Sequence, residues 1–138
     1  MFEAFWLFLY YRGMNYLLVV LGGGLGALLR YVCVRVIPPA AGGLLPLGTV
    51  FVNCAGAFLI GFLSGFFDAF PSGERLRLFA VTGFLGGYTT FSAYAWETAA
   101  SCMRGNIFLA FLGVAATNGV GIGCVFLGIW LGRLVYAK

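Results

Sequence analysis

The sequence has very few charged residues and no histidine. Only 9% of its 138 residues are charged, whereas about a quarter are charged in a typical soluble domain. A domain of this size leaves much of its surface outside any core, and eight Lys/Arg with four Asp/Glu cannot cover that surface. The composition therefore excludes a disordered chain, a nucleic-acid-binding protein and a soluble enzyme. With 62% hydrophobic residues and a mean hydropathy of +1.02, it predicts a protein that lies in a lipid bilayer.

The chain also lacks the groups that proton transfer requires. Its only lysine is the last residue, Lys138, and no acidic residue lies in the middle of an apolar segment; Glu97, in the outer half of the third segment, comes nearest. Catalysis by proton transfer needs a positioned acid and base, and a proton-coupled transporter needs a titratable group at its centre. The sequence therefore predicts that the protein is not an enzyme, and it favours the binding of a ligand without proton chemistry.

Apolar runs separated by short polar turns divide the chain into four segments. A membrane-spanning helix needs about 20 apolar residues, and the runs show none of the alternation of a membrane β-barrel. The expected helices cover residues 15–37, 46–67, 76–103 and 107–135. Pro38-Pro39, the polar stretch 71–75 and the turn 104–106 separate them. We therefore expect an all-α integral membrane protein with four transmembrane helices and both termini on one side.

Residues 1–13 are apolar and aromatic but too short to cross a bilayer. Their only basic residue, Arg12, follows the apolar run, whereas a signal peptide begins with basic residues. Two interpretations remain open. The stretch is an N-terminal extension that lies at the membrane interface, where Trp and Tyr are enriched, or the native protein starts at Met14. In both cases residues 14–138 form a single membrane domain.

The positive charges at the segment ends give only a shallow orientation signal. Arg12, Arg75, Arg77, Arg133 and Lys138 lie on the N-terminal side, against Arg35 and Arg104 on the other. Because excess Lys/Arg marks the cytoplasmic side, the balance favours a cytoplasmic N-terminus by a small margin. A chain with so small a bias can insert in both orientations, which we treat as a hypothesis.

Glycine is abundant, at 22 residues, and recurs at the spacing that lets helices approach closely in lipid. The pairs are Gly22/Gly26, Gly61/Gly65, Gly83/Gly87, Gly119/Gly123 and Gly128/Gly132. Together they predict that all four helices pack tightly against other protein. Four short, tightly packed helices leave little room for a pathway within one chain, so an oligomer is the expected working unit.

The third segment contains an expected helix break. Gly86 and Gly87 followed by Thr89 and Thr90 in the middle of the span are unfavourable for a continuous helix. In a membrane, irregular backbone is tolerated only where it is buried in protein or lines a cavity. Broken helices in membrane proteins often form ion-binding sites. The alternative is a continuous helix whose threonines bond their own carbonyls.

Several residues near this break are candidates for binding an ion. Phe91, Tyr94 and Thr98 share one helical face, and aromatic edges carry partial positive charge, so the face either lines an anion path or packs against lipid and protein. Asn53 and Asn118 either bond between helices or donate to a permeating ion. For the two ionisable residues nearer the membrane edges, Arg30 and Glu97, structural roles are favoured.

Three stretches, 22–31, 46–58 and 83–92, resemble the signatures of the CrcB/Fluc fluoride channels. The resemblance covers the chain from Met14 onward and is most specific at the G-G-x-T-T-F-S element, residues 86–92. It implies an antiparallel, dual-topology homodimer in the cell membrane of a prokaryote. Such a dimer carries two pores along its interface and passively releases fluoride from the cytoplasm.

The resemblance also implies roles for individual residues. Asn53 would donate to fluoride, Phe91 and Tyr94 would be the two pore-lining rings, Thr90 and Ser92 would contribute hydroxyls, Arg30 would lie near the pore entrance, and Glu97 would be the acidic residue beyond the rings. The carbonyls of Gly86 and Thr89, two from each subunit, would hold a buried structural Na⁺. The chain departs from the family pattern at Tyr94, where many members have Phe, and at Ala93, Ala95 and Ile122, where hydroxyl residues are frequent.

Two other functions fit the composition. A small multidrug transporter also has four helices, but that class depends on a carboxylate within its first span, and residues 15–37 contain none. A non-transporting assembly subunit would need only apolar helices. The cluster of polar residues at one point in mid-span argues against this second alternative.

Overall fold

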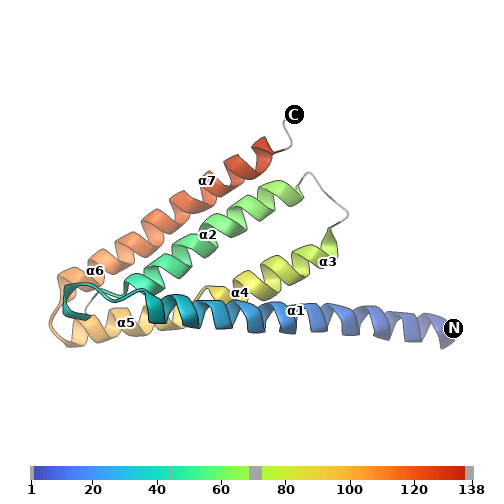
Figure 1. Cartoon of the computed structure of the whole chain (residues 1–138), viewed down its shortest axis with the longest axis horizontal. Helices are drawn as coiled ribbons and strands as arrows, with labels where there is room; N and C mark the ends of the chain where they lie inside the picture. The colour runs from blue at the N-terminus through green and yellow to red at the C-terminus, as the bar shows by residue number, and fades with distance from the viewer. Residues whose placement is uncertain (1, 44, 69–72, 136–138) are drawn as a thin grey trace.

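The computed structural model describes residues 2–43, 45–68 and 73–135, and helices account for nearly all of them (Figure 1). The first segment is α1 (Phe2–Val36), followed by the short turn η1 (Ala41–Gly43) and by α2 (Leu47–Phe67). The third segment consists of α3 (Glu74–Arg77), the π-helical η2 (Leu78–Leu85), α4 (Gly86–Tyr88) and α5 (Phe91–Met103). The fourth consists of α6 (Ile107–Ala115), the π-helical η3 (Ala116–Val120) and α7 (Gly121–Leu134).

The four expected helical segments are confirmed, with ends that agree to within two residues apart from the start of α1. Helix α1 continues through residues 2–13 without interruption, so those residues extend the first helix. At 1.5 Å per residue this helix is about 52 Å long, against a hydrocarbon core of about 30 Å. Part of the polar loop expected at 71–75, and Lys138, lie outside the described residues.

Among the described residues, three helical stretches are long and apolar enough to cross a membrane: residues 13–36, 47–67 and 107–134. The third segment has a similar extent but is divided in its middle, so none of its pieces reaches that length. The start of α1 and the end of α7 point toward the same end of the molecule, as an even number of crossings requires (Figure 1).

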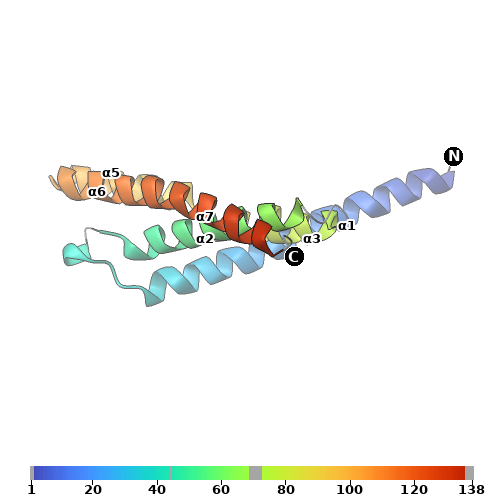
Figure 2. The ribbon, with the colours of Figure 1, turned by 90° about the horizontal axis from the view of Figure 1, so that it is seen from above.

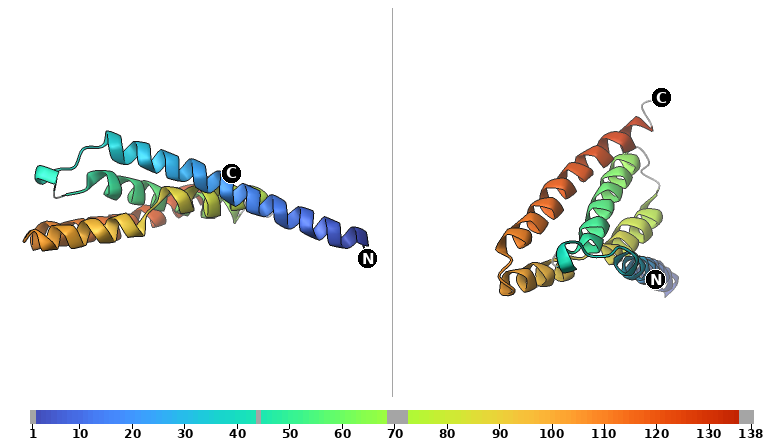
Figure 3. Two further views of the ribbon diagram at one scale, coloured as in Figure 1. Left: turned by 90° about the horizontal axis from the view of Figure 1, so that it is seen from below. Right: turned by 60° about the vertical axis from the view of Figure 1, so that its left-hand side comes forward.

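The helices pack as two close pairs. Helix α1 lies against η2 and α4, and α2 lies along α7 (Figure 1). Toward the end that carries η1 and the turn between α5 and α6, α2 lies between α1 on one side and α5 and α6 on the other (Figures 2 and 3). Helix α2 thereby reaches both close pairs and is placed to contact the divided third segment.

Glycine makes these close contacts possible. At nine of the described glycines a Cβ would come within 3.0 Å of a backbone atom of a neighbouring helix: Gly22, Gly26, Gly48, Gly61, Gly65, Gly83, Gly87, Gly128 and Gly132. Four of the five predicted glycine pairs are thus confirmed as packing sites. The fifth pair, Gly119/Gly123, has no atom of the described chain within 4 Å of either Cβ position, so its packing against other protein stays a prediction.

Few large side chains are fully enclosed by the chain itself. Among the described residues the buried hydrophobic ones are Val52, Phe67, Leu85, Tyr88 and Ala110. Many large apolar side chains on every long helix are exposed instead, including Leu28, Phe91, Phe126 and Trp130. An apolar exterior of this extent suits a surface that faces lipid or another subunit.

Candidate ion-binding site

The third segment breaks at two threonines. Thr89 (φ −79°, ψ 158°) and Thr90 (φ −147°, ψ 118°) are extended between the end of α4 and the start of α5. The predicted break is therefore confirmed, although Gly86 and Gly87 remain helical. Two β-branched residues suit extended backbone, and the Thr90 hydroxyl caps the next helix by accepting from the amide of Ala93 at 3.2 Å.

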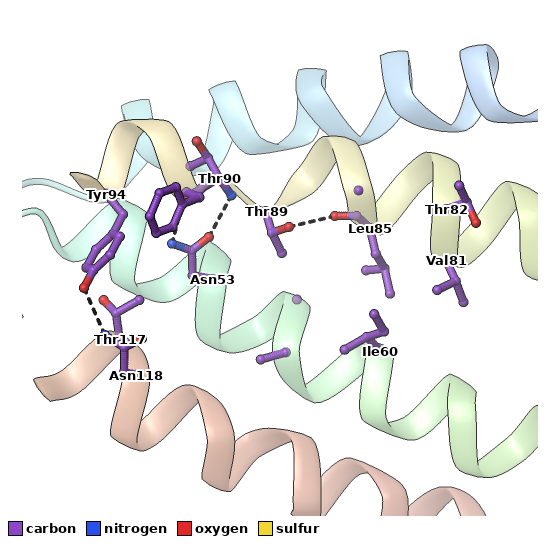
Figure 4. A pocket seen from close by; sticks show the side chains of 14 residues that line it. Asn53, Ile60, Val81, Thr82, Leu85, Thr89, Thr90, Tyr94, Thr117 and Asn118 are labelled. Carbon is purple, nitrogen blue, oxygen red and sulfur yellow. Dashed lines mark hydrogen bonds between the residues drawn. The ribbon is translucent and has the colours of Figure 1, made fainter. Parts of the chain in front are cut away.

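Asn53, on the neighbouring helix α2, forms hydrogen bonds with the backbone at the break. The amide of Thr90 donates to Asn53 Oδ1 at 2.8 Å, and Asn53 Nδ2 donates to the carbonyl of Thr90 at 3.0 Å (Figure 4). Both backbone groups of Thr90 thus find a partner where lipid offers none. The interhelical role considered for Asn53 is confirmed, and one of its two N–H hydrogens remains available.

The same hydrogen bonds leave two carbonyls without their helical donors. In an α-helix the carbonyl of residue i accepts from the amide of residue i+4. The amide of Thr90, which would serve Gly86, bonds Asn53, and the amide of Ala93, which would serve Thr89, bonds the Thr90 hydroxyl. The carbonyl oxygens of Gly86 and Thr89 are therefore free to bind a cation, as unwound carbonyls do in transporters.

A cavity of about 520 Å³ opens on the chain surface at the break (Figure 4). Seven of the predicted site residues line it: Asn53, Gly86, Thr89, Thr90, Phe91, Tyr94 and Asn118. Among the residues that the structure describes, no Asp, Glu, Lys or Arg belongs to this lining. The structure thus gathers most of the candidate residues around one uncharged cavity in the middle of the span.

The two aromatic rings lie next to each other at this cavity. The centroids of Phe91 and Tyr94 are 5.8 Å apart and their planes are inclined by 55°. The Phe91 side chain is 79% exposed, so its ring faces away from the chain's own core. Thr98 shares the helical face but donates its hydroxyl to the carbonyl of Tyr94 at 2.8 Å, so it offers no donor to a ligand.

Asn118 and Ser92 differ in how they relate to the cavity. Asn118 Nδ2 donates to the hydroxyl of Tyr94 and to the carbonyl of Val114, each at 2.9 Å, and thereby joins η3 to α5. The hydroxyl of Ser92 lies 3.3 Å from that of Thr90, but Ser92 is outside the cavity lining in the described part of the chain.

Arg30 reaches the break from α1. Its Nε donates to the carbonyl of Gly87 at 3.1 Å. That carbonyl lies between those of Gly86 and Thr89 in the chain, so two neighbouring helices, α1 through Arg30 and α2 through Asn53, supply polar partners to one short stretch of backbone. The structural interpretation of Arg30 is supported by this contact, and its placement near a pore entrance stays a prediction.

Glu97 lies apart from the break. It lines a second cavity of about 320 Å³, together with Thr49, Trp96, Ser101 and Arg104. The buried hydroxyl of Thr49 donates to Glu97 Oε1 at 2.9 Å, whereas the buried Oε2 has no hydrogen-bond partner in the described part of the chain. The structure therefore does not bring Glu97 into the cavity that Phe91 and Tyr94 line.

Sequence reasoning missed four residues that shape these cavities. Thr82 and Thr117 line the larger cavity, Thr49 binds Glu97, and Gly56 lets α2 approach the methyl group of Thr89. A lone threonine or glycine in an apolar helix carries no signal of its own. Only the register between α2 and its neighbouring helices gives these residues a role.

This arrangement defines a class of protein: a small helical membrane protein with an uncharged cavity at a broken helix. Residues 17–129 match the family described as "CrcB-like protein, Camphor Resistance (CrcB)", and the chain belongs to that family. The resemblance drawn from the three sequence stretches is therefore confirmed.

The curated relatives carry a functional name. The chain is 44% identical over 123 residues to "Fluoride-specific ion channel FluC" of Hydrogenobaculum sp., a match that covers 88% of this chain and 100% of the relative. It is 42% identical over 124 residues to the protein of that name in Rhodopseudomonas palustris, covering 88% and 99%. It is 42% identical over 118 residues to that of Pyrococcus abyssi, covering 85% and 94%.

Proposed function

We propose that the protein is a fluoride-specific ion channel that passively exports fluoride from the cytoplasm of a prokaryotic cell. The observation that carries this function is the uncharged cavity at the break, where Asn53, Phe91 and Tyr94 meet. Its occurrence in a family whose curated relatives are named fluoride-specific channels supports the choice of ion.

The cavity offers an anion several neutral partners. Asn53 has one amide hydrogen left, and the Thr90 hydroxyl, which accepts from Ala93, keeps its own hydrogen to donate when Ser92 is the donor in the contact between their hydroxyls. The rings of Phe91 and Tyr94 add edges of partial positive charge. Hydrogen bonds to a charged partner are stronger than those between neutral groups, and no proton acceptor in the lining couples passage to proton movement.

Expression in a bacterial strain that lacks its own fluoride exporter tests this function in a cell. The expected result is restored growth in fluoride-containing medium, with no protection against cationic drugs. Protection against cationic drugs without protection against fluoride would support the small multidrug transporter instead. The absence of both effects, with the protein present in the membrane, would favour a non-transporting subunit.

We propose further that two copies assemble as an antiparallel homodimer with the cavity at their interface. The cavity opens on the chain surface, and the polar residues Asn118 and Ser92 are exposed on that surface, where contact with lipid is unfavourable for polar side chains. The open pair Gly119/Gly123 lies on the same fourth segment as Asn118. The shallow charge bias between the two ends supports insertion in both orientations.

Light scattering of the purified protein in mild detergent is expected to give twice the chain mass of 14.8 kDa. Single cysteines placed at one end of the molecule should then be labelled by an impermeant maleimide from both sides of the membrane. A monomeric mass in a preparation that still conducts fluoride, or labelling from one side only, would contradict the antiparallel dimer.

A buried structural Na⁺ is the third part of the proposal. The carbonyls of Gly86 and Thr89 fit this ion, because their helical donors are diverted to Asn53 and to the Thr90 hydroxyl. Two such carbonyls from each subunit would give four oxygen ligands on the dimer axis. Bound there, the ion would supply a fixed positive charge that holds the two breaks together.

Replacing sodium by N-methylglucamine on both sides of the membrane is expected to slow fluoride efflux, because the large cation cannot enter a site formed by four carbonyls. The rate should recover when sodium returns. Efflux from protein-containing liposomes, prepared and assayed in each cation, measures the effect. A rate that is indifferent to the exchange after prolonged dialysis would count against the sodium site.

A further inference from the structure

The second aromatic residue of the site, Tyr94, carries a hydroxyl, and an interaction through the edge of its ring would not require that group. Tyr94 stands where many family members have Phe, and its hydroxyl accepts a hydrogen bond from Asn118 Nδ2 at 2.9 Å (Figure 4). Asn118 lies on η3, twenty-four residues further along the chain. The contact therefore joins the ring on α5 to the fourth segment at the edge of the cavity.

The geometry fixes which atom donates. Asn118 Nδ2 has two hydrogens and bonds two acceptors, the Tyr94 hydroxyl and the carbonyl of Val114, each at 2.9 Å. With the amide turned the other way, Asn118 Oδ1 would face the Val114 carbonyl, and two acceptors would oppose each other. Asn118 is thus the donor, and the Tyr94 oxygen accepts. The hydrogen of the Tyr94 hydroxyl is directed away from Asn118.

That hydrogen lacks a partner in the described part of the chain. The hydroxyl makes one hydrogen bond there, the one it accepts, and Tyr94 lines the 520 Å³ cavity together with Asn53 and Phe91. A hydroxyl hydrogen that faces the cavity needs an acceptor there, and an anion that enters the cavity would supply one. With no carboxylate in the lining, a small anion is the acceptor that suits this position.

We propose that the Tyr94 hydroxyl donates a hydrogen bond to the permeating anion and that Asn118 is the residue that positions it. The proposal rests on the proposed function and deepens it, because it adds a direct donor where a phenyl ring would offer only its edge. A donor of this kind favours an anion of high charge density, so it selects fluoride over chloride.

The substitution Tyr94→Phe removes the hydroxyl and keeps the ring. We expect efflux at fluoride concentrations below saturation to fall about tenfold, the lower end of what loss of a hydrogen bond to a charged partner produces. The half-saturating fluoride concentration should rise. Tyr16→Phe, on the exposed face of α1, is the matched control and should behave as the wild type does.

Asn118→Leu tests the positioning role. Alone it should weaken fluoride efflux, because the Tyr94 hydroxyl loses the partner that orients it, and in the Tyr94→Phe background it should have no additional effect. Such non-additivity is expected only if the two residues act through one hydrogen bond. Equal and additive losses, or a Tyr94→Phe channel with unchanged half-saturation, would overturn the proposal.

A binding measurement separates this proposal from the channel function itself. In protein labelled with ¹³C at the tyrosine Cζ, fluoride should shift the Tyr94 resonance, identified by its loss in Tyr94→Phe, and chloride should not. Fluoride flux in the wild type without such a shift would overturn the donor role and leave the channel function standing. A shift in a protein that conducts no fluoride would support the donor and reject the channel.

Discussion

The substitution Asn53→Leu is expected to abolish fluoride efflux and to lower the melting temperature of the protein sharply. Asn53 supplies the acceptor for the Thr90 amide and the donor for the Thr90 carbonyl. Without it, two backbone groups stay unpaired within the membrane, each at a cost of several kcal/mol. The break would rearrange, and the cavity would lose its amide donor as well.

The turn residue Asn106 provides the control for this experiment. Its Nδ2 donates to the carbonyl of Arg104 at 3.2 Å in an exposed turn, where water can replace the bond. Asn106→Ala should therefore keep both the efflux rate and the melting temperature close to those of the wild type. Wild-type efflux in Asn53→Leu would contradict the role of Asn53, and so would equal losses of stability in the two variants.

The substitution Gly26→Ala is expected to prevent the protein from folding. A Cβ on Gly26 would overlap the carbonyl oxygen of Phe84 in the third segment, and a second backbone atom, the amide nitrogen of Tyr88, lies 2.9 Å away. Backbone atoms cannot move aside as the end of a flexible side chain can. Separating α1 from η2 and α4 would also break the bond from Arg30 to Gly87.

Gly24→Ala, two residues earlier on the same helix, is the matched control. No atom lies within 4 Å of its Cβ position, and alanine favours a helix over glycine by up to about 1 kcal/mol. We expect a monodisperse peak in size-exclusion chromatography for Gly24→Ala and loss of that peak for Gly26→Ala. A folded Gly26→Ala protein of wild-type stability would show that α1 packs elsewhere.

The four helical segments could be predicted because each corresponds to a continuous apolar run long enough to form a membrane-spanning helix. The break could be predicted because Thr89 and Thr90 follow two glycines in mid-span, although the structure uses the threonines for the break and Gly87 for a close contact with Gly23. These features depend on neighbours in sequence or on helical spacing. Local chemistry is therefore sufficient to find them.

The partners of the site residues could not be predicted in the same way. Asn53 was expected either to bond between helices or to bind an ion, and only the register of α2 against the third segment shows that it bonds Thr90, thirty-seven residues away. The carbonyl that Arg30 binds carries no sequence signal at all. The π-helical turns η2 and η3 carry no sequence signal either, because they reflect helix packing more than residue type.

The central claim is that the uncharged cavity at the break conducts fluoride selectively. The most direct measurement is anion efflux from liposomes that contain the purified protein, followed with a fluoride electrode and, in parallel, with a chloride electrode, after a potassium ionophore is added to balance charge. The account predicts rapid fluoride efflux and no chloride efflux above that of empty liposomes. Fluoride efflux no faster than from empty liposomes, or equal efflux of the two ions, would contradict it.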